Sequence, residues 1–172
     1  MISHIDLKKY AKNLRKTILN TAYKAGSKSA HIGGALSSAD IISVLFGKVM
    51  NFDKENRDYQ KRDRFILSKG HACLAYYAGL LEKGFFSQEE LNTFEEDGSN
   101  FLGHPVMNKN LGIEFSTGSL GMGLSIGIGL ALASKKKKID FKTFVLLGGG
   151  EGNEGSVWEA AMCAPNLKIE NL

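Results

Sequence analysis

The sequence is poor in cysteine and contains no long hydrophobic run, and both absences narrow the kind of protein it can be. Only two of its 172 residues are cysteines, Cys73 and Cys163, far apart and without the spacing of a metal site or a disulfide framework. This usage fits a reducing compartment. No run approaches the roughly 18 apolar residues of a membrane span, and the N-terminus lacks the apolar core of a signal peptide. We therefore expect a cytoplasmic protein with no membrane partner.

The positive charge of the chain gives little support to a nucleic-acid partner. The formal net charge is +4, and much of the excess lies in the lysine run 135–138 and in the lysine-rich N-terminal segment. Neither segment carries interleaved aromatic residues or a nucleic-acid-binding motif. A lysine-rich helix C-terminus, which the helix dipole stabilises, explains the run, so we expect no nucleic-acid partner.

Segments of helical periodicity alternate with short apolar runs in a chain whose length fits a single domain, residues 1–172. Apolar spacing, a capping box at 87–90 and glycine stops predict helices over 4–24, 39–50, 71–83, 87–97 and 154–164, the last ending at Pro165. Buried strands are predicted over 64–67 and 141–147, with loops over 27–36 and 98–118. This alternation predicts an α/β fold, a parallel sheet with helices on both faces.

Residues 119–134 are rich in glycine and yet apolar. The four glycines at 121, 123, 127 and 129 each weaken a helix by about 0.8–1 kcal/mol relative to alanine. A flexible loop would explain them, but the apolar residues between them argue against it. We expect instead that the glycines let this segment approach a sheet or a ligand closely.

The most informative stretch is the glycine-rich segment 148–155, Gly-Gly-Gly-Glu-Gly-Asn-Glu-Gly, which directly follows the apolar run 144–147. A strand that ends in glycines before a helix presents backbone N–H groups to a phosphate. Residues 150–155 also match the dinucleotide pattern G-x-G-x-x-G. That pattern needs an acidic residue about 20 positions further on, at the end of a second strand. Glu170 has the offset but no completed strand, so a nicotinamide dinucleotide-binding domain remains an alternative.

Three histidines, His31, His71 and His104, each lie beside glycine in a predicted loop or at the end of a predicted element. One such histidine is an ordinary polar loop residue, but three suggest a single convergent site. Imidazoles donate hydrogen bonds to phosphate or sugar oxygens and relay protons. Zinc is the competing interpretation, and the spacing lacks the paired ligands of a metal site.

Four ordered motifs resemble those of transketolase, and the likeness runs from about residue 5 to the end. They are Phe-Ile-Leu-Ser-Lys-Gly-His-Ala at 65–72, Gly-His-Pro at 103–105, Ser-Thr-Gly-Ser-Leu-Gly-Met-Gly-Leu-Ser at 116–125, and Glu-Gly-Asn-Glu-Gly-Ser-Val-Trp-Glu-Ala-Ala at 151–161. The sequence is most similar to the separate N-terminal subunit of split transketolases. The pair Glu154-Gly155 looks more like transketolase than like the related deoxyxylulose-phosphate synthases.

The resemblance implies the pyrophosphate domain of the thiamine diphosphate-binding fold. It also implies transfer of two-carbon ketol units between ketose and aldose phosphates, as in the pentose phosphate pathway. The implied residues around thiamine diphosphate are His71, Gly118, Ser119, Leu120, Gly148, Gly149, Gly150, Glu151 and Glu154. His31 and His104 would face the substrate and the thiazolium, forming the catalytic set with His71. Glu154 resembles the glutamate that communicates between the two active sites of a dimer.

One position departs from the family pattern. Where the family has Gly-Asp-Gly, whose aspartate binds the Mg²⁺ or Ca²⁺ that bridges the diphosphate, this chain has Gly149. Proteins hold Mg²⁺ through one or two carboxylates plus phosphate oxygens, so losing one weakens or removes the metal site. Glu151 is the nearby carboxylate that could replace it. We therefore assign no metal ligand.

The resemblance also places some family parts outside this sequence: the C-terminal strands and the glutamate that activates the aminopyrimidine. We therefore expect an incomplete domain that needs a C-terminal transketolase subunit. An open sheet edge and apolar surface favour a homo- or hetero-oligomer. The alternative is a degenerate fragment that serves as a non-catalytic binding or scaffold module.

Overall fold

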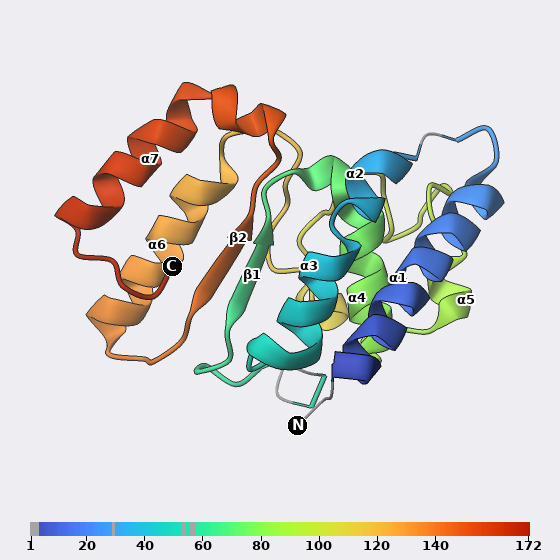
Figure 1. Cartoon of the computed structure of the whole chain (residues 1–172), viewed down its shortest axis with the longest axis horizontal. Coiled ribbons are helices and arrows are strands. Elements are labelled where there is room, and N and C mark those ends of the chain that lie inside the picture. Colours follow the sequence, from blue (N-terminus) through green and yellow to red (C-terminus); the bar gives the residue numbers. More distant parts are fainter. Residues whose placement is uncertain (1–3, 29, 53, 56–57) are drawn as a thin grey trace.

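The computed structural model describes residues 4–28, 30–52, 54–55 and 58–172, and helices cover both faces of a parallel sheet (Figure 1). Strand β1 (Arg64–Leu67) pairs with strand β2 (Thr143–Leu146), with Phe65 opposite Phe144. The predicted α/β architecture is confirmed, although both strands are short. The carboxyl ends of the two strands lie at the same edge of the sheet, where the chain turns into the glycine-rich loops.

The first face of the sheet carries the main hydrophobic core. Helices α1 (His4–Ala25), α3 (Ala39–Val44) and α4 (Cys73–Glu82) pack there, and residues 73–80 of α4 are all buried. The ring of Phe65 lies 5.1 Å from that of Phe46 and 5.2 Å from that of Tyr76. Alternate strand residues point toward this core, as the period of two in a strand requires.

The second face is covered by helix α6 (Gly123–Lys137), with helix α7 (Gly155–Asn166) packed outside it (Figure 1). A Cβ atom at Gly127 would lie 2.5 Å from Cγ2 of Val145, and one at Gly123 would overlap the side chain of Ser68. The prediction that glycines allow close approach is therefore confirmed at these two positions. It is wrong at Gly129, where a Cβ would meet no atom of the described chain within 4 Å.

The remaining elements are short: α2 (Ile32–Leu36), a π-helical turn (Leu45–Val49), α5 (Gln88–Leu91), and 3-10 turns at Gly70–Ala72, Lys109–Leu111 and Gly150–Asn153. The predicted loop 27–36 is wrong over α2, where the Ser38 hydroxyl donates to the Gly34 carbonyl. Helix α7 also continues through Pro165 to Asn166. Lysines 135–137 do form the last turn of α6, as predicted.

Helix α5 ends well before the predicted Asp97, although its predicted capping box is present at Ser87 and Glu90. The chain leaves the helix because Glu95 adopts a positive φ of 61° and its N–H donates to the Phe101 carbonyl at 2.9 Å. The Glu95 carboxylate also accepts the Gly103 N–H. This contact with a later loop offsets the helical preference of the segment. Within the described ranges, no helix is long and apolar enough to cross a membrane.

Candidate functional site

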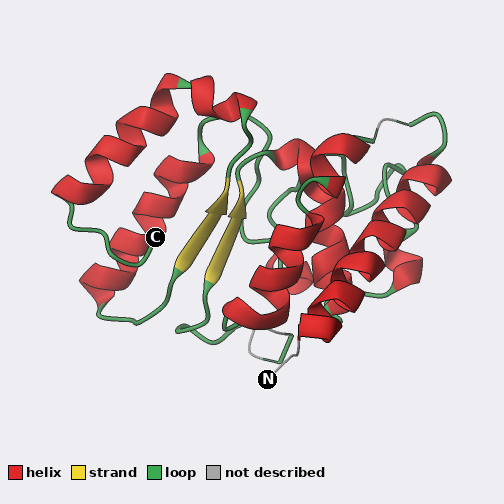
Figure 2. Cartoon of the chain, in the orientation of Figure 1, coloured by secondary structure: helices red, strands yellow, loops and turns green. Residues whose placement is uncertain are grey.

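The candidate site is built from loops that gather above the carboxyl ends of β1 and β2 (Figure 2). Residues 68–71 follow β1 and residues 148–154 follow β2. The segment 116–121 leads into α6 and packs against both, as its contacts with Gly70 and Glu151 show. In open α/β sheets this edge is where ligands bind.

The three predicted histidines lie together beside these loops. The ring centroid of His31, at the start of α2, lies 5.7 Å from that of His71 and 5.8 Å from that of His104. Their predicted convergence is confirmed, whereas their roles stay predictions. The pKa of His71 is lowered, chiefly by burial and then by the neighbouring His31, Lys69 and His104, while Glu151 opposes the shift. The His71 ring is therefore neutral at pH 7, with one N–H donor and one acceptor nitrogen.

Glu151 holds three of the loops together, and we call this arrangement the Glu151 clamp. Its carboxylate is 1% exposed and accepts hydrogen bonds from the Ser68 hydroxyl, the Gly121 N–H at 2.8 Å and the Gly148 N–H at 2.8 Å. The Ser68 hydroxyl also accepts the Gly123 N–H at 3.1 Å. One carboxylate thus fixes the ends of both strands against the loop that begins α6.

Close backbone contacts also hold the loop after β1 against the 116–121 loop. A Cβ atom at Gly70 would lie 2.7 Å from the Gly118 nitrogen and 2.8 Å from the Thr117 carbonyl oxygen. One at Gly118 would lie 3.2 Å from Cδ2 of His104. Glycine at both positions lets the loop after β1 reach the 116–121 loop and lets that loop reach the histidines.

Lys69 lies between the glycine loop and α2 and was not among the site residues predicted from the sequence. It is 8% exposed, and its ammonium donates to the Gly34 carbonyl at 3.4 Å and the Ser37 hydroxyl at 3.3 Å. Burial lowers its pKa, while Glu151 opposes the shift. The sequence feature that points to Lys69 is its position two residues after the buried strand 64–67, where the ligand-binding edge of the sheet begins.

The other predicted site residues lie around the histidines and the Glu151 clamp. Gly149 and Gly150 are exposed, and a Cβ at either would meet no atom of the described chain within 4 Å. Ser119 and Leu120 are exposed on the loop before α6. Glu154 is exposed at the N-cap position of α7, and within the described chain its side chain makes no capping hydrogen bond.

A small cavity opens at the 116–121 loop. It measures about 270 Å³ and is lined by Ser116, Thr117, Gly118, Ser119, Met122, Gly123 and Ile126. The Thr117 hydroxyl is buried without a hydrogen-bond partner in the part of the chain that the structure describes. Together with the open glycine backbone and the buried Lys69, this orphaned hydroxyl fits a ligand that carries phosphate.

The same residues do not fit a divalent metal. Among the described residues, no group of three or more histidines, cysteines or carboxylates is placed to hold one. The Glu151 carboxylate is turned into the clamp, where its oxygens already accept three hydrogen bonds. Glu151 therefore does not replace the aspartate missing at Gly149.

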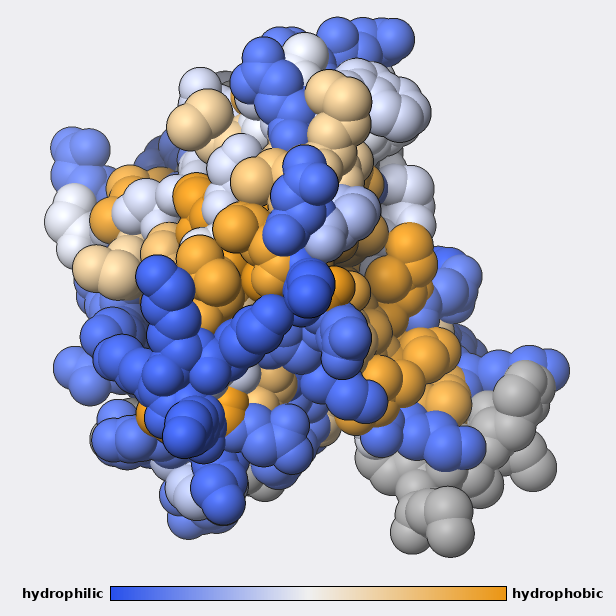
Figure 3. Space-filling model, turned by 90° about the vertical axis from the view of Figure 1, so that its left-hand side faces the viewer, coloured by the Kyte–Doolittle hydropathy of each residue, from blue (hydrophilic) through white to orange (hydrophobic). Residues whose placement is uncertain are grey.

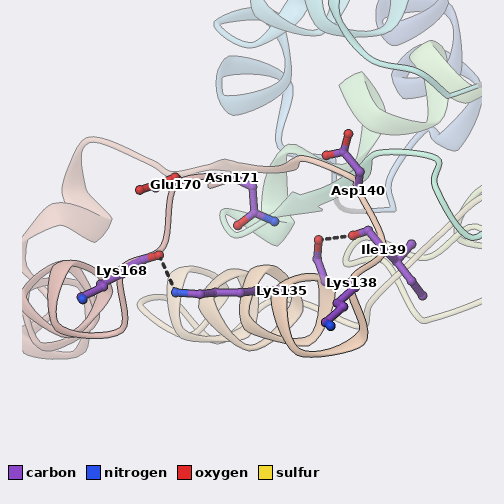
Figure 4. Close-up of a pocket in the computed structure, with 8 residues that line it drawn as sticks. Lys135, Lys138, Ile139, Asp140, Lys168, Glu170 and Asn171 are labelled. Carbon is purple, nitrogen blue, oxygen red and sulfur yellow. Dashed lines mark hydrogen bonds between the residues drawn. The ribbon is translucent and has the colours of Figure 1, made fainter.

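A larger cavity of about 460 Å³ lies at the other end of α6 (Figure 4). It is lined by Ser134, Lys135, Lys138, Ile139, Asp140, Lys168, Glu170 and Asn171. The Asn171 carbonyl accepts the N–H of Thr143, the first residue of β2, so this cavity lies at the amino edge of the sheet. Glu170 is thus remote from the glycine loop, and the nicotinamide interpretation is wrong because its acidic partner stands at the wrong edge.

Comparison with known proteins gives concordant matches. Residues 7–172 match the family model described as transketolase, thiamine diphosphate binding domain. The chain is 44% identical to an apulose-4-phosphate transketolase subunit of Phocaeicola vulgatus, over 92% of this chain and 55% of that protein. It is 39% identical to human transketolase, over 96% of this chain and 26% of that protein.

The fold matches as well. A crystal structure of transketolase from Campylobacter jejuni superposes with a TM-score of 0.88 at 34% identity, covering 96% of this chain and 27% of that one. The chain thus spans little more than half the length of the Phocaeicola vulgatus relative and about a quarter of the longer transketolases.

Proposed function

The chain belongs to the transketolase family, in its thiamine diphosphate-binding domain, and from this membership we propose that it is the N-terminal, diphosphate-binding part of a transketolase. Such an enzyme moves two-carbon ketol units between ketose and aldose phosphates. One observation carries the proposal: His31, His71 and His104 converge beside the glycine loops at the carboxyl edge of the sheet.

The residues of this chain would bind and orient the reactants. When bound, thiamine diphosphate supplies the nucleophilic carbon that such a transfer needs. The N–H groups of residues 149 and 150 and the ring of His71 would hold its diphosphate, with Gly118, Ser119 and Leu120 beside it. His31 and His104, both exposed, would donate hydrogen bonds to the sugar hydroxyls and pass protons at their ring nitrogens.

The site is open on one side and needs a further protein part to enclose it. His31, His104 and Gly149 are all exposed, whereas a site for a cofactor excludes water when it is complete. The Phocaeicola vulgatus relative is itself named as one subunit of a transketolase. The proposed partner of this chain is accordingly a separate C-terminal transketolase subunit, in a hetero-oligomer or with a second copy of the chain.

An apolar patch on the side of α7 supports such a partner. We define the α7 patch as Leu120, Met122, Trp158 and Met162, which are 39%, 51%, 62% and 66% exposed. Ser156 of α7 donates to the Gly121 carbonyl at 3.0 Å, which joins the two segments of the patch. Figure 3 views the molecule from this side and shows apolar residues open to solvent among charged ones. Exposed apolar patches mark interaction sites.

The activity is tested by reconstitution. The chain is mixed with a C-terminal transketolase subunit, thiamine diphosphate, Mg²⁺, a ketose phosphate and an aldose phosphate, and ketol transfer is measured. We expect His31→Ala and His104→Ala to lower kcat by about 100-fold or more, because each removes a proton-relaying ring. Lys138→Ala, on the exposed end of α6, serves as the control and should leave kcat unchanged. Absence of ketol transfer by both the native chain and the Gly149→Asp variant would contradict the proposal that the chain is part of an enzyme.

The partner surface is tested with Trp158, the single tryptophan of the chain. Adding the C-terminal subunit is expected to shift its fluorescence to shorter wavelength, because a 62% exposed indole becomes buried. Trp158→Arg should weaken the association, measured by calorimetry, at least about 10-fold, since buried tryptophans dominate interfaces. Tyr23→Arg is the matched control, because Tyr23 is 87% exposed on α1, across the sheet from α7. Equal weakening by both variants would contradict the assignment of the patch.

The second candidate function is a binding module without catalysis. The observation that favours it is Gly149, with no carboxylate of the described chain placed to replace the family aspartate. Such a module would bind thiamine diphosphate and the C-terminal subunit but show no ketol transfer. The reconstitution assay therefore separates the two candidates.

A further inference from the structure

This chain has glycine at position 149, where the family has a metal-binding aspartate. The difference points to another way of holding the diphosphate. Gly149 offers no ligand, and the Glu151 carboxylate is consumed in the clamp. A diphosphate carries several negative charges, which need a counter-charge when they leave water. Some other group of the site must supply it.

Lys69 is a cation that the site itself contains. It is 8% exposed, and within the described chain its ammonium donates only to neutral oxygens, the Gly34 carbonyl and the Ser37 hydroxyl. No carboxylate of the described residues lies within 4 Å of it, whereas Arg62 and Arg64, which are also largely buried, both have Glu114 within that distance. A buried ammonium without an adjacent anion is costly, which favours an anionic ligand beside it.

The position of Lys69 suits that ligand. A Cβ atom at Gly148 would lie 3.5 Å from Cβ and 3.6 Å from Cδ of Lys69, so the side chain crosses the start of the glycine loop. Its ammonium ends at α2, where a Cβ at Gly34 would lie 2.9 Å from Cδ2 of His71. Lys69 therefore spans the space between the N–H groups of the loop and the histidines.

We propose that the diphosphate is held without a divalent metal, with the ammonium of Lys69 supplying the counter-charge beside the glycine-loop N–H groups and His71. This inference rests on the proposed function, because it concerns the same cofactor. A lysine is a compact point charge that tolerates varied phosphate geometry, unlike a metal that needs fixed ligands. The neutral His71 ring adds one N–H donor and can take up a proton when the anion arrives.

The titratable groups around His71 determine how the protonation of its ring changes when the diphosphate binds. Lys69, His31 and His104 disfavour a proton on the ring, and Glu151 favours one. A bound diphosphate adds negative charge on the side of Lys69 and offsets its repulsion. Binding should then tighten as the pH falls from 8 to 6, whereas a carboxylate metal ligand stays deprotonated throughout that range and gives no such increase.

The test is calorimetric titration of thiamine diphosphate into the chain mixed with a C-terminal transketolase subunit, once in EDTA and once in Mg²⁺. We expect dissociation constants within twofold of each other. Lys69→Met should weaken binding at least 10-fold, while Lys69→Arg, which keeps the charge, should retain most of it. Gly149→Asp should create metal dependence, with at least 10-fold tighter binding in Mg²⁺ than in EDTA. Lys138→Met, an exposed lysine at the far end of α6, is the matched control and should bind as the native chain does.

The outcomes separate this inference from the proposed function. Binding by the native chain in Mg²⁺ but not in EDTA overturns the inference and leaves the function standing. Binding in neither condition overturns both. Native affinity in a folded Lys69→Met variant, with unchanged circular dichroism, also overturns the inference, because the counter-charge would then come from elsewhere.

Discussion

Glu151→Ala is expected to lower the free energy of unfolding by about 3–5 kcal/mol, because each buried hydrogen-bonding group left without a partner costs about 1–3 kcal/mol. The substitution removes the acceptor of the Ser68 hydroxyl and of the Gly121 and Gly148 N–H groups. Urea unfolding followed by far-ultraviolet circular dichroism measures the loss. The fluorescence of Trp158, whose indole N–H donates to the Gly152 carbonyl at 2.8 Å, reports the glycine loop separately.

Glu159→Ala is the control for the clamp. Glu159 lies exposed on α7, a few residues from the same loop, and its removal should change the free energy of unfolding by less than about 0.5 kcal/mol. A loss below about 1 kcal/mol for Glu151→Ala would show that the loops hold their positions without the carboxylate. The Glu151 carboxylate would then not be needed to position the loops of the candidate site.

The helices and strands that the sequence predicted well are those fixed by local pattern. Helix α1 has an apolar stripe of helical period, and β1 and β2 are short apolar runs between glycine-rich or polar segments. The predicted end of helix α5 was wrong because the contacts that end the helix involve residues further along the chain. The Glu95 N–H and carboxylate bind the backbone of Phe101 and Gly103, a contact that no local pattern encodes.

The candidate site also has one part that could be predicted from the sequence and one part that could not. The histidines could be predicted to converge because each is beside glycine at the end of an element, and parallel strands bring such ends to one edge. The Glu151 clamp could not be predicted, since a glutamate in a glycine-rich loop is ordinarily exposed to solvent. Its burial depends on Gly121 and Ser68, residues 30 and 83 positions away.

The glycine loop shows why a motif needs its three-dimensional surroundings. The pattern at 150–155 fits both a dinucleotide and a thiamine diphosphate loop. The position of Glu170 at the amino edge of the sheet removes the first interpretation. The open space at Gly149 also shows that the absence of the aspartate is not enforced by packing, because a Cβ there would meet no neighbour within 4 Å in the described chain. The surroundings of position 149 therefore leave room for a side chain.

Glu114→Gln is expected to destabilise the fold by about 3–5 kcal/mol, the cost of removing one partner from a buried ion pair. The Glu114 carboxylate contacts the Arg62 guanidinium, with both side chains 8% exposed, and lies 3.8 Å from Arg64. The pKa of Arg64 is lowered chiefly by burial and then by Arg62, and Glu114 opposes that shift. Without the carboxylate, two partly or wholly buried guanidinium groups repel each other with less compensation.

The loss of stability in Glu114→Gln should also affect the candidate site, because Glu114 leads directly into the 116–121 loop. Its N–H lies 3.4 Å from the Tyr76 hydroxyl, which donates to the Gly112 carbonyl at 2.8 Å, so the carboxylate and the backbone together fix the approach to that loop. The matched control is Asp40→Asn, which removes the Arg15–Asp40 pair at 2.6 Å, where the Asp40 side chain is 73% exposed. Exposed pairs contribute about 0–1 kcal/mol, so Asp40→Asn should change the urea midpoint little. Equal shifts in the two variants would mean that burial does not strengthen the Arg62–Glu114 pair and that the 116–121 loop is held by its glycine contacts alone.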